Sequence, residues 1–383
     1  MKVLARCKPA YLLTKTLLLL SLASPFGVAQ TGTAQRPAAL EPWVLGPFEK
    51  QDAANPCLSP LATTPFACPV RGETVQWEEK DVFNPAAVVR KGRVYLLYRA
   101  EDKVGKYAGT SRLGLAVSRD GLTFERQPRP VLYPDHDAME KYEWEGGCED
   151  PRLVEREDGT YVLTYTAYDG QTARLCVATS PDLVTWKKHG LAFEKAHGGK
   201  YKDTWSKSGS IVCRRDGSRM VATLLAGKYW MYYGDTDIFV ATSDNLLDWQ
   251  PLEGPDGKPL AAFGPRRGRF DSRLVEPGPP AWITDEGIQL LYNGMNLDAG
   301  VAGSDPNLPG GTYTAGQVLL DPKDPTQVLK RTGSYFMRPD KPYEITGQVG
   351  NVCFLEGLVY FKGKWLLYYG TADSRIAVAS YQR

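Results

Sequence analysis

The amino-acid sequence predicts an all-β fold, and three features of its pattern carry this prediction. Short runs rich in β-branched and aromatic residues alternate with period 2 and are bounded by Gly, Asp and Pro, as strands are. Helical periodicity is weak along the whole chain of 383 residues. One phrase recurs at a nearly fixed period, and such repetition of short strands is typical of a β-propeller.

The recurring phrase is a hydrophobic strand that ends in Ala-x-Ser and is followed by a charged turn and an aromatic residue. It occupies residues 115–124, 177–186 and 240–249, and its serines lie 62 and 63 residues apart. A partial copy ends at Ser380, and the intervening 137 residues leave room for two units, the first of which is degraded around residues 316–321. Counting these strand groups predicts a five-bladed β-propeller. A pair of β-sandwiches is the alternative, but it would not explain the repeat.

A second kind of strand lies before the phrases. Hydrophobic and aromatic residues alternate with polar ones in residues 94–99, 161–166, 288–293 and 365–370. We expect a strand at each of these four places.

The first 29 residues are expected to be a signal peptide. Residues 1–15 hold four cations and no acid, a short apolar run follows, and small residues precede Gln30. The apolar run is shorter than the roughly 18–20 residues that a membrane span needs. We therefore expect an exported chain, periplasmic or extracellular, with no membrane contact after cleavage. Residues 30–76 are expected to form an N-terminal lead-in and loop, and residues 77–383 the propeller.

Composition argues against several classes of protein. The net charge is +2, and removal of the four N-terminal cations leaves 42 Lys and Arg against 44 Asp and Glu, so no basic field for nucleic acid is expected. The chain has only three His, which argues against a Ser-His-Asp triad and against a His-rich metal site. Neither a metal nor another cofactor is expected.

Six cysteines follow the predicted signal peptide. Cys57 and Cys68 flank a Pro-rich loop, and we expect them to form a disulfide. The alternative for the other cysteines is a free thiol buried in a strand, which we expect for Cys176 and Cys213. The sequence has no CxxC pair, so a zinc ribbon is not expected.

Four segments carry polar residues that stand out from the repeat. Since the loops and inner strands of all blades meet at one mouth of a propeller, we expect these segments to converge there. They are residues 80–85 with the strand end at 98–102, residues 146–153, residues 229–235 and residues 270–281.

Each segment also has a simpler structural explanation. Arg99 could form a surface salt bridge with Glu101 or Asp102, and Asp150 could pair with Arg152 within a turn. The aromatic residues before Asp235 could be ordinary core, and Glu276 could lie on an exposed loop.

Carboxylates next to aromatic residues suit chemistry on a neutral sugar, because rings stack on C–H faces while carboxylates bind hydroxyls. Glu149 and Asp150 are adjacent, and successive side chains of an extended strand point to opposite faces, so we expect only one of them to face the centre. Glycoside hydrolysis needs two carboxyl groups, one as acid and one as base or nucleophile. The sequence shows no nucleophilic Ser motif, P-loop or Rossmann glycine pattern that would favour other chemistry.

At these segments the chain resembles glycoside hydrolase family 130, the five-bladed propellers that include β-mannoside phosphorylases and β-mannosidases. The resemblance spans about residues 77–381 and rests on landmarks that occur in register. They are Phe83-Asn84-Pro85, Tyr98-Arg99-Ala100, Glu149-Asp150-Pro151-Arg152, Ser180-Pro181-Asp182-Leu183, Pro279-Pro280 and Tyr369-Gly370 followed by Asp373.

The resemblance implies roles for individual residues. Asp150 would be the acid, and it would protonate the leaving oxygen through a hydroxyl of the bound mannose. Lys207 would lie near the same mouth. The mannose in the −1 subsite would be held by Asn84, Arg99, Arg152 and Asp373.

The resemblance also separates two branches of the family. The phosphorylases carry Arg, Lys and His residues for phosphate, including a Tyr-His-Gly and a His-Arg-Pro. Here the first reads Tyr292-Asn293-Gly294, and residues 225–229 lack the second. Asp235 and Glu276 lie where the β-1,2-mannosidase branch has an acidic pair. Anions at this place would repel phosphate and favour a water molecule.

The sequence therefore predicts an inverting exo-β-mannosidase with Glu276 or Asp235 as the general base. The linkage that we expect it to cleave is β-1,2. A β-mannoside phosphorylase that releases mannose 1-phosphate is one alternative, and a non-catalytic sugar-binding propeller is another. The expected partner is a β-mannoside oligosaccharide, and no nucleic acid is expected.

Overall fold

A computed structural model of the chain describes residues 41–382, and most of its regular structure is β-strand. The only helices in this part are α1 (Glu140–Glu143), α2 (Pro342–Ile345) and a 3-10 turn at Ala196–Gly199. None of them is long and apolar enough to cross a membrane. The predicted all-β fold is confirmed. The predicted signal peptide lies outside the described residues.

The strands form antiparallel groups made mainly of strands that follow one another along the chain. The first two groups are β4 (Asp81–Arg90), β5 (Arg93–Glu101), β6 (Ser111–Ser118) and β7 (Glu125–Arg126), then β8 (Gly147–Glu155), β9 (Tyr161–Tyr168), β10 (Ala173–Ser180) and β11 (Lys187–Leu191). The next is β12 (Ser210–Ile211), β15 (Tyr229–Tyr233), β16 (Ile238–Ser243), β17 (Gln250–Pro251) and β18 (Ala261–Phe263).

The remaining strands complete the same pattern. They are β19 (Leu274–Pro277), β20 (Trp282–Ile283), β21 (Ile288–Met295), β22 (Tyr313–Leu320) and β23 (Val328–Arg331), then β24 (Cys353–Phe361), β25 (Lys364–Thr371) and β26 (Arg375–Tyr381) with β1 (Glu49–Lys50). A hairpin of β13 (Cys213–Asp216) and β14 (Arg219–Ala222) lies between groups. The four strands predicted at residues 94–99, 161–166, 288–293 and 365–370 are confirmed in β5, β9, β21 and β25.

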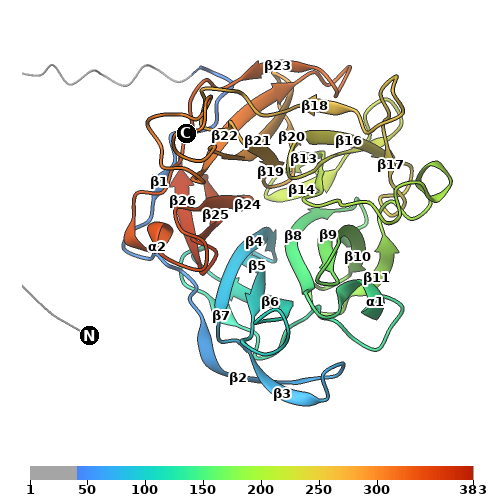
Figure 1. Cartoon of the computed structure of the whole chain (residues 1–383), viewed down its shortest axis with the longest axis vertical. Coiled ribbons are helices and arrows are strands. Elements are labelled where there is room, and N and C mark those ends of the chain that lie inside the picture. The colour runs from blue at the N-terminus through green and yellow to red at the C-terminus, as the bar shows by residue number, and fades with distance from the viewer. Residues whose placement is uncertain (1–40, 383) are drawn as a thin grey trace, which may run out of the picture. The chain divides into compact units, whose positions relative to one another are not determined.

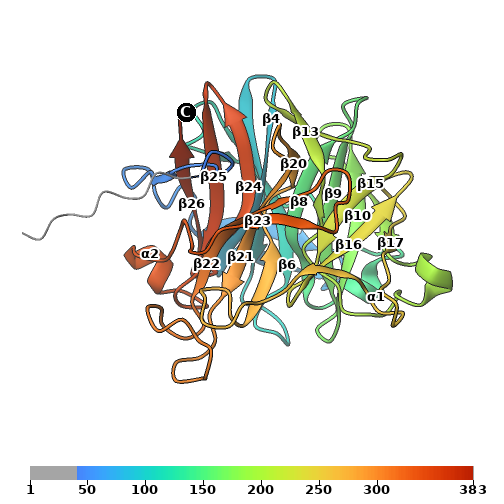
Figure 2. The ribbon, with the colours of Figure 1, turned by 90° about the horizontal axis from the view of Figure 1, so that it is seen from above.

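Neighbouring groups meet through single parallel pairs. Ser111 of β6 pairs with Gly147 of β8, and Cys213 of β13 pairs with Trp282 of β20. Strand β1 pairs with β26, which brings the start of the described chain beside its end. Figure 1 shows the groups side by side around a common centre, with β4, β8 and β24 close to it. Figure 2 shows the same strands running in a similar direction when seen from above.

The Ala-x-Ser repeat is a hydrogen-bonded turn. The hydroxyl of Ser243 accepts hydrogen bonds from the backbone N–H groups of Asn245 and Leu246. The Asn245 side chain in turn accepts from the N–H groups of Leu247 and Asp248, and the Trp249 indole donates to the carbonyl of Leu246. The same serine bonds recur in the copies at residues 118–123 and 180–185, where the carboxylates of Asp120 and Asp182 accept in place of the Asn245 amide. The repeat therefore marks the end of the third strand of a group.

A second repeated set of contacts links the second and outermost strands in four of the groups. The fifth residue of each of the four predicted strands is a buried Tyr whose hydroxyl donates to a carboxylate that precedes the group, at 2.8–2.9 Å. Each of these carboxylates also accepts from a cation in the outermost strand. The four sets are Tyr98–Glu78–Arg126, Tyr165–Glu143–Lys188, Tyr292–Asp271–Arg331 and Tyr369–Glu344–Lys50.

The segment before residue 77 is not the plain lead-in and loop that the sequence predicts. It contains β1 and a hairpin of β2 (Leu61–Cys68) and β3 (Glu73–Glu78). Val75 and Trp77 alternate with polar residues in β3, and both side chains are buried against the core of the first group. The Trp77 ring stacks on that of Tyr98 with centroids 6.1 Å apart. This burial gives the hairpin a structural role.

The predicted disulfide between Cys57 and Cys68 is wrong. All six cysteines among residues 41–382 are free thiols. The thiol of Cys57 donates to the carbonyl of Ile376 in β26, whereas the sulfur of Cys68 accepts from Arg112 in β6. The two side chains therefore face different strands. The buried free thiols expected at Cys176 and Cys213 are confirmed.

The Tyr–carboxylate–cation sets predict a stability effect. The substitution Lys188→Met should lower the free energy of unfolding by about 3 kcal/mol, because it leaves the fully buried Glu143 without its cation. Lys187→Met changes the neighbouring exposed lysine and should shift the same quantity by less than about 0.5 kcal/mol. Denaturant unfolding of both variants checks this. Equal effects would show that the cation does not compensate the buried carboxylate.

Candidate active site

A cavity of about 280 Å³ collects most of the residues that the sequence singles out. Six of the eight predicted site residues line it: Asn84, Arg99, Asp150, Lys207, Glu276 and Asp373. They come from the first halves of β4 and β8, from β19, the end of β5, the segment before β12 and the turn between β25 and β26. The remaining wall is formed by Phe83, Met295, Tyr313, Gln348, Val349, Val352 and Phe354.

Local irregularities of the strands aim the polar side chains into this cavity. Asn84 and Asp150 both have a positive φ, 46° and 47°, and each lies where the pairing with the next strand slips out of register. Ala372 and Asp373 have φ values of 48° and 49°. A positive φ strains the backbone of a residue other than glycine, and such residues cluster at functional sites.

Arg99 is the centre of charge of the cavity. Its guanidinium contacts Glu101 at 2.7 Å, Glu149 at 2.9 Å and Asp150 at 3.1 Å, and it lies over the ring of Phe83. Glu149 and Asp150 therefore reach the same cation, although only Asp150 lines the cavity. The slip between Glu149 and Arg152 in β8 breaks the strict alternation of side chains, so both carboxylates can reach Arg99.

Asp150 is held as a carboxylate. Burial alone would raise its pKa, but the positive charges of Arg99 and Lys207 and a hydrogen bond from Asn84 outweigh burial and hold the pKa well below its usual range. The Lys207 ammonium lies 3.4 Å from Asp150 Oδ2, and Asn84 Nδ2 donates to Oδ1 at 2.9 Å.

Glu276 has the opposite balance. Burial raises its pKa to about 7 against the lowering effect of Lys207 and Arg152, and the negative charge of Asp235 adds to the rise. Its Oε1 accepts a hydrogen bond from Ser208. A carboxyl group of this kind exchanges its proton near neutral pH, as a general base does.

Asp373, which lines the cavity, and Glu149, which contacts Arg99, also have raised pKa values. Burial raises the pKa of Asp373 to about 7, even though Arg99 lowers it. Burial and the neighbouring Asp150 charge raise the pKa of Glu149 to about 7, and Arg99 again opposes the rise.

Arg152 does not line the cavity, in contrast to the sugar contact that the resemblance implies. It is 1% exposed, and it donates to the carbonyls of Pro277 and Gly278 at 2.7 and 2.8 Å. A salt bridge of 3.3 Å joins it to the buried Glu356. The Arg152 guanidinium donates to the backbone that directly follows Glu276, so it holds Glu276 in position without contacting the cavity.

Asp235 lies in the turn after β15 and lines a neighbouring cavity. Its Oδ2 accepts a hydrogen bond of 2.7 Å from the indole N–H of Trp205. The structure therefore separates the two acids that the sequence treats as candidates for one role, and it places Glu276 with Asp150.

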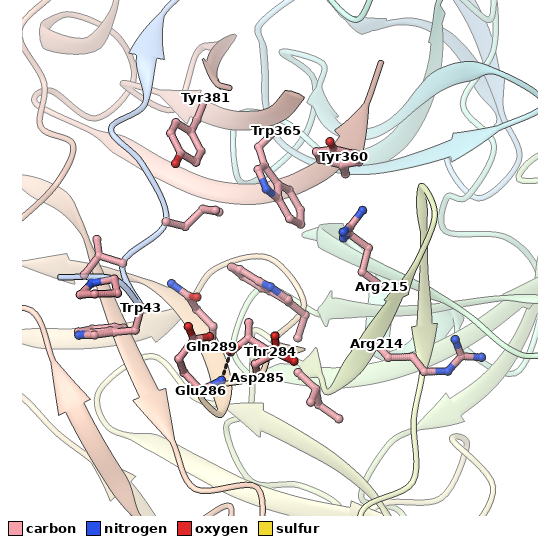
Figure 3. A pocket seen from close by; sticks show the side chains of 15 residues that line it. Trp43, Arg214, Arg215, Thr284, Asp285, Glu286, Gln289, Tyr360, Trp365 and Tyr381 are labelled. Atoms are coloured by element: carbon pink, nitrogen blue, oxygen red, sulfur yellow. Dashed lines mark hydrogen bonds between the residues drawn. The ribbon is translucent and has the colours of Figure 1, made fainter. Parts of the chain in front are cut away.

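A larger cavity of about 560 Å³ lies at the opposite ends of the strands (Figure 3). It is lined by aromatic residues such as Trp43 and Trp365, and its carboxylates are those of Asp285 and Glu286. Both acids are exposed, so this cavity lacks the buried carboxyl groups that line the smaller one. Among residues 41–382 no group of three or more His, Cys, Asp or Glu side chains is arranged to hold a metal ion.

Sequence reasoning placed Glu101 at the surface and missed two further residues that shape the site. Glu101 accepts from Arg99, Lys80 and Ser111, although its place at a strand end suggested a surface pair. Ser208 and Glu356 carry no local signal, because their partners lie 68 and 204 residues away in the chain.

The family model of glycoside hydrolase family 130, described as beta-1,4-mannooligosaccharide phosphorylase, matches residues 49–383. The chain belongs to glycoside hydrolase family 130. It is therefore an enzyme of a glycoside-processing family, as the sequence resemblance predicts.

Some relatives of this family 130 chain are named as phosphorylases and others as hydrolases. A 1,2-beta-oligomannan phosphorylase from Thermoanaerobacter sp. (strain X514) is 33% identical over 79% of this chain and 90% of its own. A solved glycosyl hydrolase from Bacteroides ovatus is 46% identical, with a TM-score of 0.86 over 90% of this chain and 96% of the other. A further solved structure has the same identity and coverage and a TM-score of 0.87. It is described with the words that the family "contains glycoside hydrolases that target beta-1,2 mannosidic linkages in Candida mannan".

The contact between Gly370 and Asn84 predicts an effect on activity. A Cβ at position 370 would lie 2.2 Å from Asn84 Oδ1, so Gly370→Ala should displace Asn84 from Asp150. We expect kcat/KM to fall at least tenfold. Gly333→Ala, where the nearest atom to an added Cβ is 3.8 Å away, is the matched control. Unchanged turnover in Gly370→Ala would contradict the assignment of Asn84 to the site.

Proposed function

We propose that the protein is an exported, inverting exo-β-mannosidase that hydrolyses β-1,2-linked mannosides in the cavity around Asp150 and Glu276. A five-bladed β-propeller would carry this cavity at its mouth. Within the proposal, Asp150 is the acid, Glu276 is the general base, and Asn84, Arg99, Lys207 and Asp373 bind the sugar.

The strand groups support five blades. Their first strands would be β4, β8, β12, β19 and β24, and β1 would close the last blade by pairing with β26. Four of these groups carry the same Tyr–carboxylate–cation set, as repeated units of a propeller would.

The observation that carries hydrolysis over phosphorolysis is the state of the two cations that line the cavity. Arg99 already contacts three carboxylates, and Lys207 contacts Asp150. Glu276 adds a further acid to the same wall. A site in which each cation is already paired with an acid repels a phosphate dianion and accepts a neutral water molecule.

Asn293 supports the same conclusion. It stands in the Tyr-Asn-Gly sequence where the phosphorylases carry His, as the resemblance has it. Here its side chain is buried and bonds both the N–H and the carbonyl of Leu355. This side chain therefore stabilises β24 and leaves no group for an anion.

The reaction would proceed by direct displacement. Glu276 accepts a proton from a water molecule while the oxygen of that water attacks the anomeric carbon. The bond from this carbon to the leaving oxygen breaks on the opposite face of the sugar. A hydroxyl of the bound mannose passes its proton to the leaving oxygen and takes one from Asp150. The small cavity volume suits one terminal sugar ring, which supports exo action.

Asp150 must gain a proton before it can act as the acid. Arg99 and Lys207 keep its pKa low against the opposing effect of burial. A neutral sugar hydroxyl inserted at the 3.4 Å contact between Lys207 and Asp150 would weaken that ion pair and raise the pKa of Asp150. Substrate binding would thus prepare the acid.

Phosphorolysis is the second candidate, because the curated relatives at 33% and 29% identity are named as phosphorylases. Measurement of mannose and mannose 1-phosphate from β-1,2-mannobiose, with and without phosphate, separates the two. We expect mannose without added phosphate. Strict dependence on phosphate would overturn the hydrolytic proposal.

Export is proposed from the sequence alone. The basic start, apolar run and small residues of positions 1–29 support it. The N-terminal residue of the mature protein, determined after expression with the native leader, tests it, and the expected first residue is Gln30.

The raised pKa of Glu276 predicts the pH dependence of hydrolysis. A base with a pKa of about 7 is protonated below that pH, so kcat/KM should fall as the pH decreases through 7 and should level off above it. Glu276→Gln should lower turnover by about 10²–10⁴-fold and remove this limb. Glu286→Gln, an exposed acid at the far cavity, is the control. A profile that stays unchanged in Glu276→Gln would exclude Glu276 as the base.

A further inference from the structure

The far cavity, the hollow of about 560 Å³ shown in Figure 3, lies away from the carboxylate cavity around Asp150 and Glu276. Strand β24 reaches both of them. Phe354 near its start lines the carboxylate cavity, and Tyr360 near its end lines the far cavity. A strand rises about 3.3 Å per residue, so these two walls are about 20 Å apart. One sugar ring cannot contact both.

Three polar groups in the wall of the far cavity have no hydrogen-bond partner among residues 41–382. They are the indole N–H of Trp282, the indole N–H of Trp365 and the side-chain oxygen of Gln289, whose amide nitrogen donates to Gln317. The three residues are nevertheless only 3%, 8% and 3% exposed. Buried polar groups in proteins are almost always hydrogen-bonded. The wall therefore presents two donors and one acceptor to a bound molecule.

Aromatic rings form much of the remaining wall. The Trp365 ring packs against Trp282 and Tyr360, with centroids 5.6 and 5.4 Å away. The guanidinium of Arg215 lies 4.5 Å from the centroid of the partly buried Tyr360 ring. Figure 3 shows Trp365 and Gln289 reaching into the hollow from opposite sides. Rings fixed by such packing offer an apolar surface to the C–H groups of a sugar, while the free polar groups suit its hydroxyls.

The formal charges at the far cavity balance one another. Arg214 and Arg215 lie on the hairpin of β13 and β14, and Asp285 and Glu286 lie in the turn between β20 and β21. Two cations and two acids give no net field that would select an anion or a cation. A neutral ligand that carries hydroxyl groups fits this wall best.

We propose that the far cavity is a second carbohydrate site, which binds a mannoside chain without cleaving it. It has room for two sugar rings, because its volume of about 560 Å³ is twice the 280 Å³ of the cavity that suits one ring. Its two acids are adjacent and exposed, so it lacks the buried pair of carboxyl groups that carries the proposed cleavage. The site would hold a polymeric substrate while the end of a chain enters the carboxylate cavity. The choice of mannose rests on the proposed function, whereas the existence of the site does not.

Affinity electrophoresis tests the second site. Glu276→Gln protein, in which turnover is suppressed, is run in native gels with and without a soluble β-1,2-mannan or a soluble β-1,4-mannan. The carboxylate cavity accepts only the end of a chain, and a polymer offers few ends, so retardation reports mainly on the far cavity. We expect retardation by at least one polymer, which gives an apparent Kd. Absence of retardation by both polymers would overturn the proposal.

Trp→Phe substitutions remove the free donors and keep an aromatic ring. The double substitution Trp282→Phe and Trp365→Phe, in the Glu276→Gln protein, should raise the apparent Kd at least fivefold. Trp249→Phe is the matched control, because Trp249 is fully buried, does not line the far cavity and donates its indole N–H to the carbonyl of Leu246. We expect this control to stay within twofold of the parent.

Arg215→Ala keeps the test decisive if the double variant does not fold, because Arg215 is exposed. It should raise the apparent Kd at least threefold. An unchanged Kd in the far-cavity variants would overturn the second site. So would retardation that disappears only in Asn84→Ala, since the polymer would then bind in the carboxylate cavity.

A turnover assay separates this proposal from the proposed function. In an otherwise wild-type chain the far-cavity substitutions should leave kcat/KM for β-1,2-mannobiose within twofold, because this substrate is too short to reach both cavities. A tenfold fall in a folded far-cavity variant would contradict a separate site. Failure of wild-type hydrolysis would overturn the proposed function and leave the result of the gels intact.

Discussion

Arg99 brings three acidic side chains together in a largely buried cluster, and the arrangement of the site depends on this single guanidinium. Each carboxylate would be expensive to bury without a cation. The planar guanidinium satisfies several at once because it offers donors in fixed directions. Asn84 and Lys207 complete the shell around Asp150. The acidic side chains of the cluster are therefore held in fixed positions, and the cations of Arg99 and Lys207 balance their charge.

The same principle recurs at the periphery of the fold. Four buried carboxylates there are each held between a Tyr hydroxyl and a cation of an outer strand. Each set links the second and last strands of a group, so it fixes the width of that group. Buried acids thus hold the scaffold together in one place and carry the proposed chemistry in another.

Local sequence pattern predicted the strands, and the family resemblance supplied several of the residues that line the cavity, among them Lys207 and Asp373. Period-2 alternation located β5, β9, β21 and β25, and the Ala-x-Ser phrase marked true hydrogen-bonded turns. The strand irregularities were not predictable, since a slip in register at Asp150 depends on its partner strand. The disulfide failed for a similar reason, because Cys57 is positioned by Ile376 more than 300 residues later. Arg152 was assigned to the sugar from its motif, although its buried donors bind backbone.

The two candidate bases, Glu276 in β19 and Asp235 after β15, illustrate what geometry adds to a motif. Glu276 and Asp235 are equivalent candidates in the sequence, and the structure places them in adjacent cavities of different character. A buried acid with a raised pKa suits proton transfer, whereas an acid bonded to an exposed indole suits positioning.

The configuration of the first product tests the central claim most directly. Hydrolysis of β-1,2-mannobiose in phosphate-free buffer can be followed by proton NMR before mutarotation equilibrates the anomers. If a water molecule activated by Glu276 attacks directly, the mannose from the non-reducing end is released first as the α-anomer. Initial release of β-mannose, or no mannose until phosphate is added, would contradict the account.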